Sequence, residues 1–168
     1  MRKSLFLMAI ALLSVTFVSA QNYMVVNSEK VFKSLTAYNN ALETLDDLAE
    51  SYQNTVDQTF AAVEQMYNSY RQQRASLSES ARQAREQQIL NAEAEATKYQ
   101  ESLFGADGEL MKRRMELIQP IQQRVFDTLE SFAKQKGYDL IIDIAANPTV
   151  LYYSSKIDFT DRIIEALK

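Results

Sequence analysis

The chain has 168 residues, of which 18 are basic and 22 acidic, and its formal net charge is −4 at neutral pH. It contains no cysteine and no histidine, which excludes disulfides and removes the common ligands of zinc sites and the usual bases and nucleophiles of covalent catalysis. The acidic balance also argues against a nucleic-acid partner. We therefore expect a protein that is not an enzyme and holds no metal ion or cofactor, although an active site built only from carboxylates stays open at this point.

The N-terminus has the pattern of a secretory signal peptide. Arg2 and Lys3 precede an apolar run, Leu5–Val18, and small residues follow up to Ala20. This order predicts a signal peptide over residues 1–20, cleaved after Ala20, and a mature chain that begins at Gln21. Loss of the two basic residues lowers the net charge from −4 to −6.

An uncleaved membrane anchor carrying a stator-like coiled coil is the alternative for this segment. The apolar run of about 14 residues rises only about 21 Å as a helix, which is short of the ~30 Å hydrocarbon core of a bilayer. We therefore favour cleavage, which the mass of the secreted chain would decide.

A strand is predicted at the start of the mature chain. Residues 23–27 are rich in β-forming side chains. Asn27 and Ser28 are N-cap residue types, so a helix should follow at once, adjust its course near Thr36–Asn40 and run on to about Ala75.

The next segment predicts a long helical hairpin, because the chain has no glycine before Gly105 and no proline before Pro120. Apolar residues recur every three or four positions, as in a coiled-coil seam. In the first helix they are Leu42, Leu45, Ala49, Tyr52, Val56, Thr59, Val63, Met66 and Tyr70, and in the second Ile89, Ala92, Ala96, Tyr99 and Leu103. The cap-rich segment 76–80 separates the two, with capping boxes at Ser76/Glu79 and Ser80/Gln83. We expect an antiparallel arm over residues 41–110 with its tip at 76–80.

Two glycines interrupt the second helix. Gly105 and Gly108 are three residues apart, and each costs about 1 kcal/mol relative to alanine inside a helix. We interpret them as a hinge. The apolar stripe resumes from Met111 to Phe132, and Pro120 within it predicts a bend near Glu116–Leu117.

The C-terminal part predicts a small β-rich body. Gly137 ends the long helix, and strands follow at about 138–144 and 149–154, with a terminal helix at about 158–167. Together with residues 21–40, the segment 111–168 should form this body, which gives an α+β fold class. So few strands make little core alone, which favours a homo-oligomer in which sheets from several chains join.

Several segments resemble the Skp/OmpH family of periplasmic chaperones. They are Tyr23–Asn27, Gly137–Asp143, Val150–Tyr153 and Ile157–Asp161. Phe104–Leu110, followed by Arg114 and Pro120-Ile121, is similar to the Bacteroidetes-type form of the family. The resemblance covers essentially all of residues 23–168. It departs in charge, since enterobacterial members are strongly basic and this chain is acidic.

The resemblance implies a homotrimer in which helical arms extend from a small β-barrel body around a cavity. It further implies an ATP-independent holdase in the periplasm that binds unfolded outer-membrane proteins and delivers them for barrel assembly. No phosphate-binding glycine loop is present in the sequence. The alternative is a structural or adaptor coiled-coil protein of the cell envelope, which would bind one fixed partner.

Charge along the arm changes sign toward the tip. Residues 34–70 contain no Lys or Arg but several carboxylates, whereas Arg71, Arg74, Arg82 and Arg85 surround the tip. These arginines form a candidate basic patch for anionic lipid head groups or acidic client segments. Ordinary solvation of a coiled-coil tip is the alternative, and Glu79 and Glu86 oppose the patch.

Aromatic and sulfur-containing side chains on the first arm helix are candidate client contacts. Phe60 and Tyr67 lie seven residues apart, one position off the seam, and Met66 and Tyr70 complete the candidate set. Core packing is the alternative, above all for Tyr70, which falls on the seam.

Asp139 and Asp143 would share one face of the strand at 138–144. A pair of carboxylates can serve as general acid and base. Because no histidine or metal motif accompanies them, we favour capping or ion-pair roles in the body.

Overall fold

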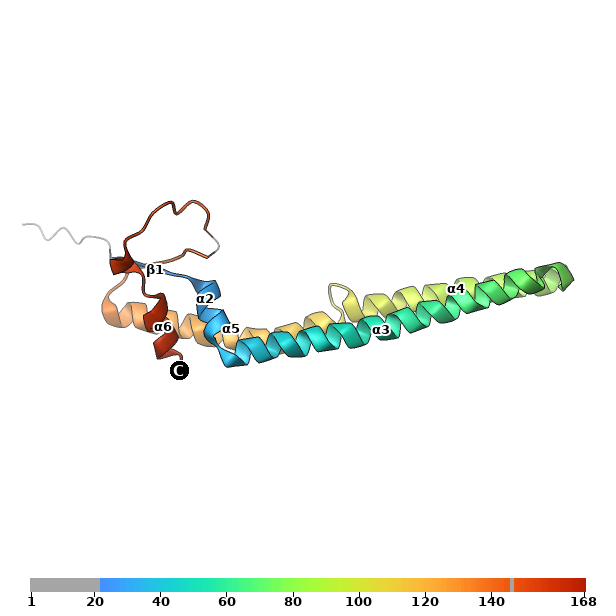
Figure 1. Cartoon of the computed structure of the whole chain (residues 1–168), viewed down its shortest axis with the longest axis horizontal. Coiled ribbons are helices and arrows are strands. Elements are labelled where there is room, and N and C mark those ends of the chain that lie inside the picture. The colour runs from blue at the N-terminus through green and yellow to red at the C-terminus, as the bar shows by residue number, and fades with distance from the viewer. Residues whose placement is uncertain (1–21, 146) are drawn as a thin grey trace, which may run out of the picture. The chain divides into compact units, whose positions relative to one another are not determined.

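The computed structural model describes residues 22–145 and 147–168. The predicted signal peptide, its cleavage site after Ala20 and the first mature residue, Gln21, lie outside the described residues. Two compact units are present: one combines the described residues up to Val31 with Thr128–Lys168, and the other is Phe32–Asp127. The chain is mostly helical, with long helices and a two-stranded sheet (Figure 1).

Two long helices lie entirely within the second unit. Helix α2 (Ser28–Ser34) enters it and stops at Leu35, whose extended backbone separates it from α3 (Thr36–Gln73). The helix is therefore interrupted at a single residue, Leu35. This interruption comes just before Thr36–Asn40, where we expected the helix to change its course. Because α3 contains no glycine or proline, it runs 38 residues without interruption.

A short 3-10 turn, η1 (Arg74–Ser76), joins α3 to α4 (Glu79–Phe104), and the two long helices lie side by side (Figure 1). The cap of α4 differs from both expected capping boxes. Ser78 is the N-cap, and its side chain accepts a hydrogen bond from the Ala81 N–H at 3.4 Å. The Ser76 hydroxyl instead donates to the Gln73 carbonyl at 2.8 Å, which closes the preceding turn.

Contacts between side chains show which parts of α3, α4 and α5 (Glu109–Lys136) meet within the second unit. The Tyr52 and Phe104 rings pack edge to face with centroids 6.3 Å apart. Nearer the α2 end, a core cluster joins α3 to α5. It consists of Ala41, Leu45 and Ile118, with Tyr38, Leu110, Leu117 and Ile121 packed against it. The unit therefore extends beyond the predicted arm, 41–110, at both ends.

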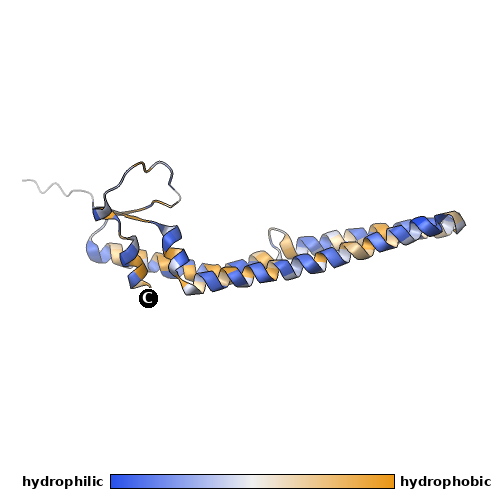
Figure 2. Ribbon diagram, in the orientation of Figure 1, coloured by the Kyte–Doolittle hydropathy of each residue, from blue (hydrophilic) through white to orange (hydrophobic). Residues whose placement is uncertain are grey.

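Several residues of the predicted seams are exposed. Leu42, Met66 and Tyr99 are 38%, 36% and 39% exposed, whereas Leu45, Val56 and Ala96 are buried. Met111 and Met115, expected in the α5 stripe, are 42% and 56% exposed. Figure 2 shows the underlying pattern, in which apolar residues recur along α3 between longer hydrophilic stretches. The period was predicted correctly, but the packed stripe is narrower than the sequence pattern.

The junction between α4 and α5 is a tight loop. Gly105 donates its N–H to the Glu101 carbonyl at 2.8 Å, and Gly108 donates to the Gly105 carbonyl at 2.9 Å. A Cβ on Gly105 would lie 2.4 Å from the Glu101 oxygen, and one on Gly108 would lie 2.7 Å from the Leu103 oxygen. Close backbone approach therefore requires both glycines. Beyond them, α5 continues through Pro120 as one helix.

The first unit is built on a parallel pair of strands. Strand β1 (Tyr23–Val26) pairs with β2 (Leu140–Asp143), with Tyr23 opposite Leu140 and Val26 opposite Asp143. On the β1 backbone, Val25 also forms an isolated bridge to Asp158. After the short turn η2 (Ser155–Ile157), helix α6 (Thr160–Ala166) closes the chain.

Side chains around β1 form the core of this unit. Met24, Val25, Val26 and Val31 are at most 2% exposed, and Ile163 of α6 is fully buried. The ring of Phe159 packs against those of Phe132 and Tyr138, with centroids 5.7 and 5.0 Å apart.

The strand expected at 149–154 is wrong, since Thr149–Ser154 form no strand in the structure. The segment pairs with neither edge of the sheet: β1 is bonded to β2 and bridged at Asp158, and among the described residues β2 has no other strand beside it. Leu151 and Tyr152 are 94% and 86% exposed, so these two side chains pack against little of the described part of the chain.

Candidate functional site

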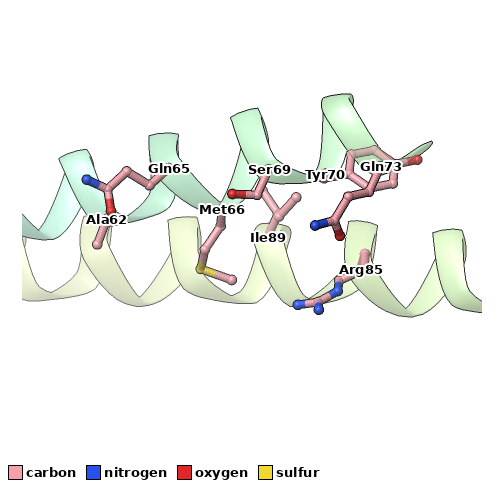
Figure 3. A pocket seen from close by; sticks show the side chains of 8 residues that line it. All are labelled: Ala62, Gln65, Met66, Ser69, Tyr70, Gln73, Arg85 and Ile89. Carbon is pink, nitrogen blue, oxygen red and sulfur yellow. The ribbon is translucent and has the colours of Figure 1, made fainter. Parts of the chain in front are cut away.

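A groove between α3 and α4 brings together candidates from two different predicted sets. Met66 and Tyr70 come from the client-contact set and Arg85 from the basic tip. The groove has a volume of about 490 Å³, within the range of ~300–1,000 Å³ typical of ligand pockets. Its lining, drawn in Figure 3, consists of Ala62, Gln65, Met66, Ser69, Tyr70 and Gln73 from α3, and Arg85 and Ile89 from α4.

Sequence reasoning missed Gln65, Ser69 and Gln73 in this groove. These polar residues stand four positions apart on α3, so they follow one line along the helix. They adjoin the apolar seam, and their spacing could have marked them. What the sequence pattern could not give is the position of Arg85 and Ile89 across from them.

Tyr70 anchors one end of the groove. Its side chain is 7% exposed, and its hydroxyl donates a hydrogen bond to the Glu86 carboxylate across the two helices. This hydrogen bond, together with burial and the negative charge of Glu86, raises the pKa of Tyr70, while Arg74 acts in the opposite direction. Tyr70 thus stays neutral, and its hydroxyl is held by Glu86 of the facing helix.

The remaining aromatic candidates lie outside the groove lining. Tyr67 is 49% exposed, and the Arg71 guanidinium sits over its ring at 5.9 Å from the centroid. Phe60 is half-buried. A client could therefore contact Tyr67, although Arg71 covers one face of its ring, whereas Phe60 leaves less of its surface exposed.

The arginines of the predicted tip patch have different local partners. Arg82 donates from Nε to the Leu77 carbonyl at 3.2 Å and lies 3.6 Å from the Glu79 carboxylate, so it holds the turn. Arg85 donates from Nη1 to the Gln88 side chain at 3.3 Å. Arg74 belongs to η1. Of the predicted tip patch, Arg82 thus holds the turn, whereas Arg85 lines the groove.

An exposed apolar face on α5 was also missed. Met111, Met115 and Phe126 are 42%, 56% and 57% exposed. Their spacing of 4 and 11 residues places them along one side of the helix. The sequence analysis expected Met111 and Met115 in the apolar stripe of this helix, whereas it did not single out Phe126.

Asp143 has a structural role in the first unit. Its two carboxylate oxygens accept hydrogen bonds from the Ser28 N–H at 3.1 Å and the Ser28 hydroxyl at 2.5 Å, and one oxygen also accepts from the Ala145 N–H at 3.0 Å. Burial would raise the pKa of Asp143, but these hydrogen bonds outweigh it and lower the pKa. Asp143 therefore fixes the start of α2, while Asp139 is exposed.

The described part of the chain contains neither a metal-binding cluster nor a helix that could span a membrane. Over residues 22–145 and 147–168, no cluster of three or more carboxylate, cysteine or histidine side chains is arranged to hold a metal ion. Within the same ranges, no helix combines the length and apolar character that a membrane span needs.

Comparisons with known proteins agree with the fold. The family model described as outer membrane protein (OmpH-like) matches residues 22–167. A crystal structure from Caulobacter crescentus CB15, described as that of a candidate outer membrane chaperone (OmpH-like), superposes with a TM-score of 0.69 at 10% sequence identity. The match covers 87% of this chain and 83% of that one. Among curated proteins, none matches this sequence.

Proposed function

The chain belongs to the OmpH-like family of outer membrane proteins, and we propose that it is an ATP-independent periplasmic holdase for unfolded outer-membrane proteins. The family match over residues 22–167 is the observation that carries this proposal. The Caulobacter protein of similar fold, described as a candidate outer membrane chaperone, points in the same direction. The proposed activity consists of binding and release, without a catalytic step.

Exposed apolar side chains on the second unit support client binding. Besides the α5 face formed by Met111, Met115 and Phe126, Tyr67 of α3 and Leu90 of α4 are 49% and 58% exposed. Methionine and tyrosine suit surfaces that adapt to many partners. Several weak contacts of this kind, repeated on more than one arm, would hold an unfolded chain through avidity.

We propose that α3 and α4 form an antiparallel coiled-coil hairpin and that the protein is a homotrimer enclosing a cavity. The contacts Tyr52–Phe104 and Tyr70–Glu86 support the hairpin, since the partner number falls as the α3 number rises. The exposed pair Leu151 and Tyr152 supports assembly, because a second copy would cover apolar surface that the single chain leaves in water.

We also propose that the tips touch anionic membrane surfaces transiently. Arg74 in η1 supports this contact because it lies at the turn between the two arm helices. The acidic stretch of α3 limits it, since like charges along the arm repel an anionic surface.

The holdase proposal is tested with the mature protein, beginning at Gln21, and an outer-membrane β-barrel diluted from urea. Light scattering should show suppression of aggregation at about one trimer per client, with no effect of added ATP. A client that aggregates equally with and without the protein contradicts the proposal.

An envelope adaptor is the second candidate function. The observation that favours it is the sterically fixed α4–α5 loop beside an uninterrupted α3, which suits a rigid spacer. Affinity purification from envelope extracts separates the two functions: a mixture of barrel proteins supports the holdase, and one stoichiometric partner supports the adaptor.

A further inference from the structure

The groove between α3 and α4 combines an apolar floor with a polar margin. Ala62, Met66 and Ile89 provide the apolar part, and Met66 as a whole is 36% exposed. The volume of about 490 Å³ accommodates a few side chains and excludes a folded domain. Figure 3 shows Met66 of α3 reaching toward α4 beside Ile89, and Arg85 of α4 lying near Gln73.

The polar margin matches the repeat of an extended polypeptide. Gln65, Ser69 and Gln73 follow α3 at intervals of four residues, which is about 6 Å along a helix. An extended chain repeats every two residues, or about 6.6 Å. Each of the three polar groups can therefore meet a successive backbone amide on the same side of an extended segment.

These three side chains are available for such contacts. None of them has a hydrogen-bond partner among residues 22–145 and 147–168. Glutamine amides and serine hydroxyls both donate and accept hydrogen bonds, so they can bind backbone N–H and C=O groups without selecting a sequence. Preference for particular client segments would come from the apolar lining residues and from the charge of Arg85.

Arg85 is the charged residue of the lining. The carboxylate next to it in sequence, Glu86, is engaged by the Tyr70 hydroxyl. Arg85 itself donates from Nη1 to Gln88 at 3.3 Å, which leaves its other N–H groups available. Charge complementarity therefore favours a carboxylate beside the bound apolar side chain.

We infer that this groove is a subsite for an extended segment of unfolded polypeptide in which an apolar side chain lies next to an aspartate or glutamate. The inference rests on the proposed holdase function and specifies where and how one client segment binds. Met66 and Ile89 contact the apolar side chain, the line of Gln65, Ser69 and Gln73 binds the backbone, and Arg85 binds the carboxylate.

The test uses the mature protein and two unstructured peptides labelled with a neutral fluorophore. Each peptide carries one leucine, flanked by aspartates in the first and by lysines in the second. Anisotropy titrations at low salt should show about threefold tighter binding of the first peptide, as expected for one exposed charge contact. The preference should shrink as added salt screens the contact.

Matched variants assign the effect to the groove. Arg85→Gln should abolish the preference, while Lys98→Gln, which removes one positive charge from α4 outside both the lining and the tip patch, should keep it. Met66→Gln should weaken the binding of both peptides about threefold or more. Leu42→Gln, at a leucine of α3 that is 38% exposed and lies outside the groove lining, should leave the binding of both unchanged. Circular dichroism of every variant verifies that the helices form.

Two results overturn the inference. One is that neither peptide binds or both bind equally well. The other is that Lys98→Gln acts like Arg85→Gln, which would mean a general charge effect. If the wild-type protein suppresses client aggregation while either result is obtained, the groove assignment fails and the holdase function stands. If suppression is absent as well, the proposed function fails.

Discussion

The Tyr70 hydroxyl of α3 donates a hydrogen bond to the Glu86 carboxylate of α4, and it does so from a ring that is 7% exposed. This contact ties the two arm helices together close to η1. It also sets the register of the two helices near the groove that Arg85 and Ile89 of α4 line together with residues of α3.

Replacing Tyr70 with Phe should lower the thermal midpoint by a few degrees, because it removes a hydrogen bond between helices. The measurement is a melt followed by circular dichroism. Tyr67→Phe, at an exposed tyrosine on the same helix, is the matched control and should melt like the wild type. Equal melting of both variants would mean that the contact contributes nothing to stability.

The raised pKa of Tyr70 predicts that the protein loses stability at alkaline pH. The hydrogen bond to Glu86 raises the folded-state pKa of Tyr70, so its contribution is fully present below the unfolded value of about 10 and is lost as the pH rises through the folded pKa. The stability difference between wild type and Tyr70→Phe should therefore shrink above about pH 10. A difference that stays constant there contradicts the assignment.

Asp143→Asn should destabilise the protein by about 1 kcal/mol at neutral pH, allowing for partial exposure of the group. The lowered pKa of Asp143 means that its contribution is present above the unfolded value of about 3.9 and is lost as the pH falls through the folded value. Urea unfolding at pH 7 and pH 3 measures this. Asp139→Asn, on the same segment but exposed, should change neither value.

Gly105→Ala should cost roughly 2 kcal/mol, because the new Cβ would lie 2.4 Å from the Glu101 oxygen and the backbone must shift. Gly137→Ala has open space, although its φ is +72°, and should cost about 1 kcal/mol from backbone strain alone. Urea unfolding gives both values. If Gly105→Ala is neutral or stabilising, the loop is not under the steric restriction described.

The hinge at Gly105 and Gly108 is tested without altering the glycines. Phe104→Ala removes the ring packed on Tyr52, so a hinge at this loop should flex more. Spin labels at positions 100 and 112 should then give a broader distance distribution than in the wild type. An unchanged distribution, with normal circular dichroism, means that the uninterrupted α3 sets the stiffness.

The double substitution Leu151→Asp and Tyr152→Asp should lower the oligomeric mass in solution, because it places charges on surface that a second copy would bury. Native mass spectrometry or light scattering measures the mass. Leu90→Asp, at a leucine that is 58% exposed on α4, is the control and should keep the oligomer. A double variant with the wild-type mass would remove this segment from the interface.

Much of the helical structure follows from local sequence. The lack of glycine and proline from α3 through α4, the cap-rich segment 76–80 and Gly105 together predicted two long helices and their ends within a few residues. The candidate site was predicted only as separate sets of residues. Met66 and Arg85 belong to different helices, and nothing local indicates that both line one groove.

The sequence by itself determined the long helices, the position of the turn between them and the resemblance to a chaperone family, since these depend on backbone propensity and residue order. Only the tertiary structure decided that Leu42 and Met66 are exposed while Leu45 is buried, that β1 pairs in parallel with β2, and that Thr149–Ser154 form no strand. A helical period specifies which residues share a face, but the position of the neighbouring helix specifies which of them it covers. A β-prone segment likewise becomes a strand only where the fold brings it alongside another backbone with which it can pair.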